Sequence, residues 1–325
     1  MRAIDPLSGS ATPGAARRRR ILLTGAAGQL GQELLAQAPA HWQLIACSRR
    51  DLDLSDPEAC RAAVARHRPD WVLNAGAYTA VDRAESEPEL ALAVNAGAPE
   101  AFAAALAATG GRLLQISTDF VFNGDQGHPY EPHQSPSPLG VYGASKAEGE
   151  RRSRLHLPEE RLCVLRTSWV YGPVGRNFCL TMLRLHQQRA EAAAPLTVVA
   201  DQVGCPTATH TLAQACIAAI DRDLWGLHHW SDAGAASWYD FAVAIGELAV
   251  EAGLLQRCAS VLPITSADYP TPARRPGYSL LACGTTRRAL DLPPLHWRSA
   301  LAAVLARLAR QSERPEGRGA TGEGQ

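Results

Sequence analysis

Three side chains in the sequence could together protonate a ketone while it is reduced. Tyr142 and Lys146 are four residues apart, so a helix beginning there would place them on one face. A free tyrosine has a pKa of about 10, and a neighbouring ammonium group lowers it by stabilising the phenolate. Thr118 adds a hydroxyl that could hydrogen-bond the substrate oxygen. The pattern predicts general acid catalysis by Tyr142 beside a hydride donor, with Lys146 also binding the nicotinamide ribose.

The place of these residues along the chain distinguishes catalysis from coincidence. A Tyr-x-x-x-Lys spacing is common on exposed helix faces, where the pair has no catalytic role. Here Tyr142 lies 24 residues after Thr118, which ends an apolar segment that is typical of a strand. Ligands bind outside the carboxyl ends of strands in open α/β sheets, and this favours the catalytic interpretation.

A glycine-rich loop near the beginning of the chain is typical of dinucleotide binding. An apolar strand leads directly into Gly25, Gly28 and Gly31, and a helix follows. Glycines permit a tight turn, let backbone N–H groups approach a pyrophosphate and let the helix pack closely on the strand. We expect the phosphates at the positive end of this helix, near Gln29 and Leu30. A turn with a purely structural role is the alternative.

The end of the second predicted strand distinguishes NADPH from NADH. An acidic side chain there accepts a hydrogen bond from the 2′-hydroxyl of NADH, whereas arginine binds the 2′-phosphate of NADPH. The strand ends in Ser48-Arg49 without a carboxylate, so we predict NADPH with Arg49 as a ligand and NADH as the alternative. An exposed turn is the competing interpretation of Arg49. Further cofactor contacts are expected from residues after the second and third strands: Asp53, Leu54, Ala75, Gly76 and Ala77.

Short apolar runs alternate with longer segments rich in alanine, leucine, glutamate and arginine. Predicted strands cover 21–24, 43–47, 71–74, 113–117, 162–167 and 196–199, and predicted helices cover 29–38, 56–67, 88–109, 142–155, 177–190, 208–222, 237–253 and 296–310. This alternation predicts an α/β fold, a Rossmann-type doubly wound parallel sheet covered on both faces. We expect a dinucleotide-binding domain at 21–170, joined by about 196–222, and a smaller, interleaved substrate-binding lobe mainly at 171–308. The active site should lie in the cleft between them.

Composition and charge exclude several classes of protein. The 325 residues contain 32 Lys and Arg against 32 Asp and Glu, which argues against a nucleic-acid or anionic-membrane binder. No run approaches the ~20 apolar residues of a membrane span. Eight scattered cysteines fit free thiols in a reducing cytoplasm. We expect a disordered basic arm at 1–20 and a disordered tail at 311–325. A secretion signal is the less favoured alternative for the arm, because polar, Gly-rich residues follow the arginines.

Longer phrases of the sequence carry a family resemblance. They are GAAGQLGQEL (25–34), RPDWVLNAGAYTAVDRAESEPELALAVNA (68–96), ISTDFVFNGD (116–125), YGASKAEGE (142–150), RTSWVYG (166–172), NF..TMLRL (177–185), DQVGCPT (201–207) and YPTPARRPGYS (269–279). Together they resemble the extended short-chain dehydrogenase/reductase family over about 21–308, and within it the dTDP-4-dehydrorhamnose reductases. The resemblance implies reduction of the C4 ketone of dTDP-4-dehydro-β-L-rhamnose, in dTDP-L-rhamnose biosynthesis for cell-surface polysaccharide.

The resemblance also implies roles for individual residues. Thr118, Tyr142 and Lys146 match the catalytic set, in which Thr118 adjusts Tyr142. Contacts with the nucleotide-sugar are implied for Thr79, Val81, Thr118, Asp119, Trp169, Asn177 and Arg275. For Arg275 a bond to the diphosphate and a loop-ordering role are equal alternatives, and Trp169 could instead be part of the core.

Some members of the family hold Mg²⁺ between two subunits through carboxylates. Glu33 matches one such position, but His210 stands where a second carboxylate is expected. The sequence therefore does not support a metal site, although family membership would allow Mg²⁺. The sequence allows a homodimer and does not decide the oligomeric state.

Two other functions share parts of the pattern. Related nucleotide-sugar dehydratases have an Asp-Glu pair after the threonine, because elimination needs an acid and a separate base. Here Phe120 follows Asp119, which argues against a dehydratase or epimerase. A non-catalytic NADP-binding subunit, resembling the regulatory subunit of methionine adenosyltransferase, would keep much of the site. The intact catalytic set argues against that reading.

Overall fold

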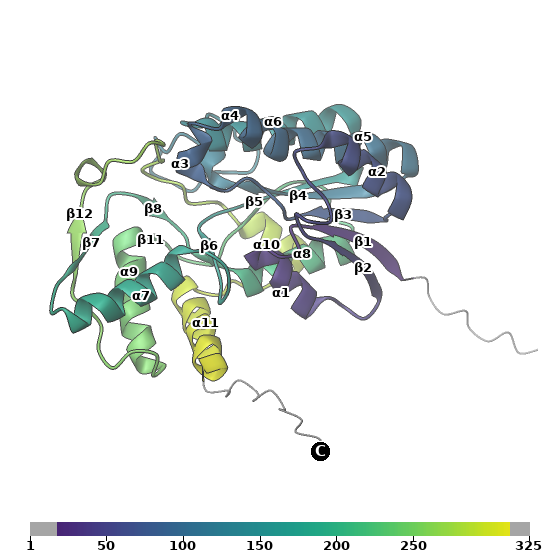
Figure 1. Cartoon of the computed structure of the whole chain (residues 1–325). Helices are drawn as coiled ribbons and strands as arrows, with labels where there is room; N and C mark the ends of the chain where they lie inside the picture. Colours follow the sequence, from purple (N-terminus) through teal and green to yellow (C-terminus); the bar gives the residue numbers. More distant parts are fainter. Residues whose placement is uncertain (1–17, 313–325) are drawn as a thin grey trace, which may run out of the picture.

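The computed structural model describes residues 18–312, and its centre is a six-stranded sheet (Figure 1). The strands are β1 (Arg19–Thr24), β2 (Trp42–Cys47), β3 (Trp71–Asn74), β4 (Arg112–Thr118), β5 (Leu162–Thr167) and β10 (Gly226–Trp230). They lie in the order β10-β5-β4-β3-β1-β2, and every pairing is parallel. The apolar runs of β3 and β5 are buried along their whole length, as expected for strands covered on both faces. The predicted doubly wound α/β fold is confirmed.

Helices cover both faces of this sheet (Figure 1). On one face lie α1 (Gln29–Gln37), α8 (Thr209–Asp221) and α10 (Gly284–Leu290), and on the other α2 (Pro57–His67), α5 (Ala98–Thr109) and α6 (Val141–His156). Before α5 come α3 (Val81–Ala84), α4 (Pro88–Leu92) and a π-helical turn, η1 (Ala93–Gly97). Contrary to the sequence expectation that no run approaches a membrane span, the continuous helix Pro88–Thr109 is long and apolar enough to cross a membrane by length and composition alone. Half of its most apolar window is buried inside the protein, and a core helix passes the same test.

A smaller lobe is built from α7 (Phe178–Glu191), α9 (Trp238–Glu251), α11 (Trp297–Ser312) and short strands. The strands pair as β7 (Leu196–Val199) with β12 (Val261–Ile264), β8 (Val203–Gly204) with β11 (Ala236–Ser237), and β6 (Val170–Tyr171) with β9 (Thr207–Ala208). Three short 3-10 turns lie elsewhere along the chain: η2 (Asp119–Val121) follows β4, η3 (Glu159–Arg161) precedes β5, and η4 (Ser266–Asp268) follows β12. A separate apolar core holds this lobe together, with Phe241 packed edge-on against Trp297. The chain returns to the main sheet at α8 and β10, so the two lobes interleave.

One strand prediction is wrong about the edge of the sheet. The sequence places 196–199 in the main sheet, but β7 pairs with β12 in the smaller lobe. The sixth position belongs to β10, which pairs with β5 and carries His228 and His229 instead of a continuous apolar run. The strand that β7 does join, β12, contains Pro263, and proline weakens a strand pattern. The helix that follows 196–199, α8, does cover the main sheet as expected.

Part of the N-terminal arginine run belongs to the folded sheet and not to the predicted arm. Residues 1–17 and 313–325 lie outside the described residues, so the predictions for the arm and tail are not tested there. Arg19 and Arg20 begin β1, contrary to the expected arm, and Arg19 pairs with Asp223 at 2.9 Å. Likewise Gln311 and Ser312 end α11.

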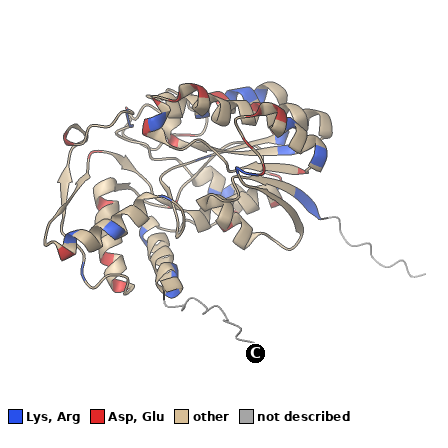
Figure 2. Ribbon diagram, viewed as in Figure 1, with Lys and Arg blue, Asp and Glu red and all other residues tan. Residues whose placement is uncertain are grey.

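The distribution of charged residues and the state of the cysteines agree with what the composition predicts. Figure 2 shows acidic and basic residues interspersed over both lobes. All eight cysteines lie within the described residues, and each is a free thiol, as predicted.

Candidate active site

The glycine loop joins β1 to α1 at the carboxyl edge of the sheet. Gly25 has a φ of +65°, a left-handed conformation that favours glycine, and a Cβ there would lie 2.7 Å from Gly76 after β3. A Cβ on Gly31 would lie 2.2 Å from the Gly25 carbonyl oxygen, so glycine lets α1 pack on the loop. No side chain of the described part of the chain caps α1 at Gly28. The free N–H groups of the first turn therefore suit a pyrophosphate, and the loop fits a dinucleotide.

A ladder of buried polar side chains supports this loop, and sequence reasoning missed it. The Thr24 hydroxyl donates to Asn74 Oδ1 (2.5 Å), and Asn74 Nδ2 donates to Gln115 Oε1 (2.7 Å). The Gly76 N–H donates to the Thr24 hydroxyl (3.1 Å). The ladder depends on strand register, because its members are directly opposite one another on β1, β3 and β4. Ala75, Gly76 and Ala77 follow it as a half-buried segment at the edge where the cofactor is expected.

The tip of β2 carries both signs of charge. Arg49 is exposed, as a ligand for a 2′-phosphate has to be. Asp51 turns back and accepts hydrogen bonds from the Ser48 N–H (2.8 Å) and Oγ (2.7 Å). These hydrogen bonds lower the Asp51 pKa and keep its carboxylate engaged within the turn. Exposed Asp53 and half-buried Leu54 follow on the same side.

The structure brings the three predicted catalytic residues together where β4 ends. Thr118 is the last residue of β4, Tyr142 lies in the first turn of α6, and Lys146 follows one turn later. The Thr118 hydroxyl donates to Asp119 Oδ1 (3.0 Å) and also interacts with the Tyr142 phenol. Lys146 is buried, and its Nζ donates to the Ile116 carbonyl oxygen (2.6 Å). Sequence reasoning missed one signal for this residue: Lys146 is the only lysine among the 325 residues.

Burial dominates the titration of this cluster. It raises the pKa of Tyr142 to about 12, and the nearby Asp119 charge adds to the rise while the Thr118 hydrogen bond opposes it. Burial lowers the pKa of Lys146 to about 8, and the charge of Glu150 opposes that fall. Burial also raises the pKa of Asp119 to about 6. Tyr142 is therefore protonated at neutral pH, as a general acid must be. Lys146 is not among the groups that shift the Tyr142 pKa, so the lowering that the sequence predicted from a neighbouring ammonium group is not found.

Asn95 ties the loop after β3 to the catalytic helix. Its Oδ1 accepts from the Tyr78 N–H (2.9 Å), and its Nδ2 donates to the Tyr78 carbonyl and to Ser145 Oγ (both 3.0 Å). Ser145 Oγ donates to the Tyr142 carbonyl oxygen (2.8 Å). Asn95 lies in the π-turn η1, and such turns are frequent at functional sites. Nothing in the local sequence distinguishes this turn from ordinary helix.

A cavity of about 840 Å³ opens between the loop after β3 and the smaller lobe. Apolar and aromatic side chains line it together with arginines. The lining includes Asp82, Phe178, Arg189, Trp238, Arg274 and Arg275. Its size and mixed lining are typical of a site for a small organic ligand. Val81, with Asp82, begins α3 beside this cavity, and exposed Thr79 precedes them.

Arg275 is engaged within the protein. Its guanidinium donates to both Asp82 oxygens (3.0 and 2.8 Å) and to the Ala273 carbonyl (3.1 Å). The contacts hold the loop 269–279 against α3 and so favour the loop-ordering alternative. Arg189 and Arg274 line the same cavity and are exposed.

Trp169 and Asn177 also have partners within the protein. Trp169 has a φ of +47°, and its ring stacks on Trp238 with centroids 3.5 Å apart. A Cβ on Gly204 would lie 2.6 Å from the Trp169 ring, so that ring is closely packed. Trp238, which sequence reasoning missed, lines the cavity. Asn177 caps α7, and its amide donates to Gln29 Oε1 (3.2 Å) beside the glycine loop.

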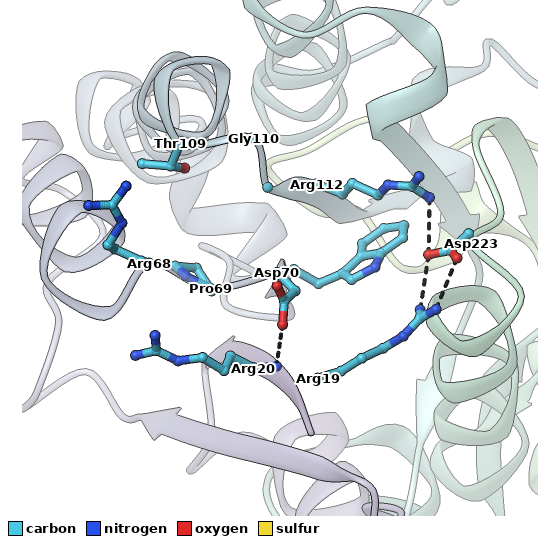
Figure 3. Close-up of a pocket in the computed structure, with 11 residues that line it drawn as sticks. Arg19, Arg20, Arg68, Pro69, Asp70, Thr109, Gly110, Arg112 and Asp223 are labelled. Carbon is cyan, nitrogen blue, oxygen red and sulfur yellow. Dashed lines mark hydrogen bonds and ion pairs between the residues drawn. The ribbon is translucent and has the colours of Figure 1, made fainter. Parts of the chain in front are cut away.

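A second hollow of about 710 Å³ lies at the opposite, amino-terminal edge of the sheet (Figure 3). Arg19, Arg20, Arg68 and Arg112 line it, and Asp223 pairs with Arg19 (2.9 Å) and Arg112 (3.0 Å). The helices α2 and α5 end at this hollow, and cations are favourable beside the carbonyl ends of helices. Arg19 and Arg112 thus have a structural partner there, and no predicted catalytic residue lines this hollow.

Glu33, the candidate metal ligand, has two partners. Its Oε1 accepts from Gln37 Nε2 (2.8 Å), and its Oε2 pairs with Arg307 (2.6 Å). Burial lowers the pKa of nearby His210, while the Glu33 charge opposes that fall. Within residues 18–312, no group of three or more His, Cys, Asp and Glu side chains is arranged to hold a metal ion.

Comparisons with known proteins agree with this geometry. The family described as the RmlD substrate binding domain matches residues 19–310. The dTDP-4-dehydrorhamnose reductase of Mycobacterium tuberculosis (strain H37Rv) is 41% identical over 299 residues, covering 90% of this chain and 94% of that protein. The spore coat polysaccharide biosynthesis protein SpsK of Bacillus subtilis is 39% identical over 289 residues, covering 88% and 96%.

Solved structures place the fold in the same group. The dTDP-4-dehydrorhamnose reductase of Bacillus anthracis, solved in complex with NADP, superposes with a TM-score of 0.82 at 32% identity, covering 89% of this chain and 99% of that one. The UDP-glucose 4-epimerase of Thermus thermophilus has a TM-score of 0.70 at 21% identity over 90% of this chain and 99% of its own, and it shares the fold alone. The resemblance inferred from the sequence is confirmed, and the chain belongs to the RmlD substrate binding domain family.

Proposed function

We propose that this protein reduces the C4 ketone of dTDP-4-dehydro-β-L-rhamnose to dTDP-β-L-rhamnose with NADPH. One observation carries the proposal: Thr118, Tyr142 and Lys146 meet where β4 ends, at the carboxyl edge of the sheet that also carries the glycine loop. The relatives that bear this activity in their names, at 37–41% identity over most of the chain, support it. We infer a cytoplasmic step in polysaccharide biosynthesis, consistent with relatives such as SpsK.

The residues at the glycine loop fit a dinucleotide, and NADPH bound there would supply the hydride that reduces C4. The backbone of Gly28, Gln29 and Leu30 would hold the pyrophosphate at the start of α1. Arg49, exposed at the tip of β2, would bind the 2′-phosphate. The NADP complex of a relative supports this choice of cofactor.

Tyr142 supplies the proton that the new hydroxyl group needs. Its pKa of about 12 keeps the phenol protonated until an alkoxide forms at C4. Thr118 orients the phenol, and the Lys146 ammonium would bind the nicotinamide ribose. Asp119 is placed to accept a hydrogen bond from a sugar hydroxyl. Elimination would need a second base next to it, and Phe120 occupies that position.

The cavity suits the dTDP part of the substrate. Phe178 and Trp238 offer aromatic faces to the base or sugar, and Arg189 and Arg274 offer guanidinium groups to the diphosphate. Arg275 would then act indirectly by fixing the loop through Asp82. In this arrangement the sugar lies between the cavity and Tyr142.

A spectrophotometric assay tests the proposal. NADPH absorbance is followed while dTDP-4-dehydro-β-L-rhamnose is generated in place, and the mass of the sugar product is measured by mass spectrometry. We expect NADPH oxidation only when the keto-sugar is present and a product heavier by two hydrogens. NADPH binding without oxidation would instead indicate a non-catalytic subunit, and a product lighter by one water would indicate a dehydratase.

A further inference from the structure

A buried ion pair lies one helical turn beyond the predicted catalytic lysine. Glu150 follows Lys146 by four residues on α6, and both side chains are buried. Arg166 on β5 donates to both Glu150 oxygens, from Nε (2.9 Å) and from Nη2 (2.6 Å). Ser117 Oγ on β4 donates to Glu150 Oε1 (2.5 Å). Two neighbouring strands therefore fix this carboxylate through three hydrogen bonds.

Glu150 and Lys146 attach the same helix face to consecutive residues of β4. Lys146 Nζ donates to the carbonyl of Ile116, and Glu150 accepts from the side chain of Ser117. Side chains four residues apart lie on the same helix face, so the carboxylate and the ammonium group share the face of α6 that packs on β4. Arg166 stays in place through further contacts with the Pro132 carbonyl (3.1 Å) and the Phe122 ring (5.0 Å).

Stability alone is a weak explanation for such a pair. Two buried charges lose hydration, and apolar residues of similar volume often stabilise a protein at least as well. The pair in this structure lies along the same helix face as Lys146, and burial lowers the pKa of that lysine. A fixed negative charge at that point opposes the effect of burial on Lys146.

We propose that Glu150 is a positioning residue for the reduction, and that its clamped carboxylate keeps the Lys146 ammonium charged and in place at the end of β4. This inference rests on the proposed catalytic role of Lys146. Glu150 does not reach the reacting atoms; it acts through the lysine.

Other ionisable groups face this part of α6 from the elements packed against it. They are Tyr142 on α6 itself, Asp119 after β4, Arg166 on β5, His229 on β10 and the pair of Glu100 on α5 with Arg152. Burial lowers the His229 pKa to about 3, so this ring is neutral. From η1 the facing side chain is the uncharged Asn95. Among these groups, Glu150 is the one whose charge shifts the Lys146 pKa.

The sole lysine makes a direct test available. Protein labelled with [ε-¹⁵N]lysine gives one side-chain nitrogen signal, and its shift with pH reports the titration of Lys146 without substrate or cofactor. We expect a midpoint near 8 in the unaltered protein. Glu150→Gln keeps the shape but removes the charge, and should lower the midpoint by about one to two pH units.

Two variants serve as controls. Glu148→Gln removes a carboxylate of the same helix that is paired with Arg151 and Arg152, and it should leave the midpoint unchanged. Glu150→Asp keeps the charge and should restore most of the lost shift. If Glu150→Gln does not fold because Arg166 is left unpaired, the double variant Glu150→Gln/Arg166→Gln is compared with Arg166→Gln alone, and the difference between their midpoints reports the Glu150 charge.

A folded Glu150→Gln variant that keeps the original Lys146 midpoint, or a double variant whose midpoint equals that of Arg166→Gln alone, would overturn the inference. The alkaline limb of the kcat/KM profile for NADPH-dependent reduction should move toward lower pH together with the nitrogen midpoint. Lys146→Met separates the two proposals: full activity in that variant would remove the catalytic role of the lysine, whereas the nitrogen titration measures the effect of Glu150 in either case.

Discussion

Replacing Tyr142 with phenylalanine removes one oxygen atom from the candidate active site and keeps the ring. The ring packs edge-on against Phe120, with centroids 5.7 Å apart and planes at 73°, and this contact needs no hydroxyl. The side chain is half-buried, so the variant leaves no large cavity. We therefore expect an unchanged fold and an unchanged affinity for NADPH.

The expected loss of rate follows from the surroundings of the phenol. A positioned general acid contributes about 10²–10⁴-fold, which corresponds to about 3–5 kcal/mol of barrier. The neighbouring donors are engaged elsewhere, because Lys146 donates to the Ile116 carbonyl and Thr118 donates to Asp119. Water must then protonate the alkoxide, and the loss in kcat should lie in the upper half of that range.

The assay compares single-turnover NADPH oxidation in the Tyr142→Phe variant with NADPH affinity measured by fluorescence. Tyr239→Phe is a matched control, because Tyr239 packs on the core of the smaller lobe and should tolerate the same loss of a hydroxyl. A Tyr142→Phe variant with kcat within about threefold of the unaltered protein would refute the assignment of the proton donor.

Three further substitutions test the parts around the acid, and Gly97→Ala serves as the control for the first of them. Gly31→Ala places a Cβ against a backbone oxygen that cannot move aside, so it should cost about 1–3 kcal/mol of stability and raise the KM for NADPH at least tenfold. Gly97→Ala, where a Cβ meets nothing within 4 Å, should leave both the melting temperature and that KM near their original values. Arg49→Asp should move the ratio of kcat/KM for NADPH over NADH at least tenfold toward NADH, and an unchanged ratio would contradict the 2′-phosphate contact. Arg275→Gln breaks a pair with Asp82 that is partly exposed, so the melting temperature should change little, while the KM for the nucleotide-sugar should rise several-fold at constant KM for NADPH.

The parts of the site that were predictable from the sequence are those with a local signature. Gly25, Gly28 and Gly31 are recognisable because a turn and a close helix contact restrict those positions to the smallest residue. Tyr142 and Lys146 are recognisable because helical spacing brings them together wherever the helix lies. Their proximity to Thr118 was predictable because ligands bind outside the carboxyl ends of parallel strands, and Thr118 ends such a strand.

Contacts that depend on register or on distant pairing had no such signature. Asn74 reaches Gln115 because β3 and β4 align them, and Arg166 reaches Glu150 because β5 lies beside β4. The same reason explains the wrong place given to 196–199, since an apolar run does not say which sheet it joins. The true edge strand, β10, was not recognised because it contains two histidines. Buried His229 is nevertheless hydrogen-bonded there, with its Nδ1 3.0 Å from the Tyr130 carbonyl oxygen.

The basic residues of this chain show why a single lysine is informative. Of the 32 Lys and Arg residues, 31 are arginines, and some of the exposed ones pair with carboxylates, as Arg83 does with Glu87 and Arg151 with Glu148. A guanidinium stays charged at any ordinary pH and is broad and planar, whereas an ammonium is compact and its pKa follows its surroundings. Position 146 needs the compact cation, because its nitrogen fits against the Ile116 carbonyl at 2.6 Å in a buried slot. Burial lowers the pKa of this ammonium group and the Glu150 carboxylate opposes that fall, a function that an arginine at this position would not require. Lys146→Arg should therefore reduce turnover while the charge is kept, and if it left kcat unchanged, charge alone would account for the role of this residue.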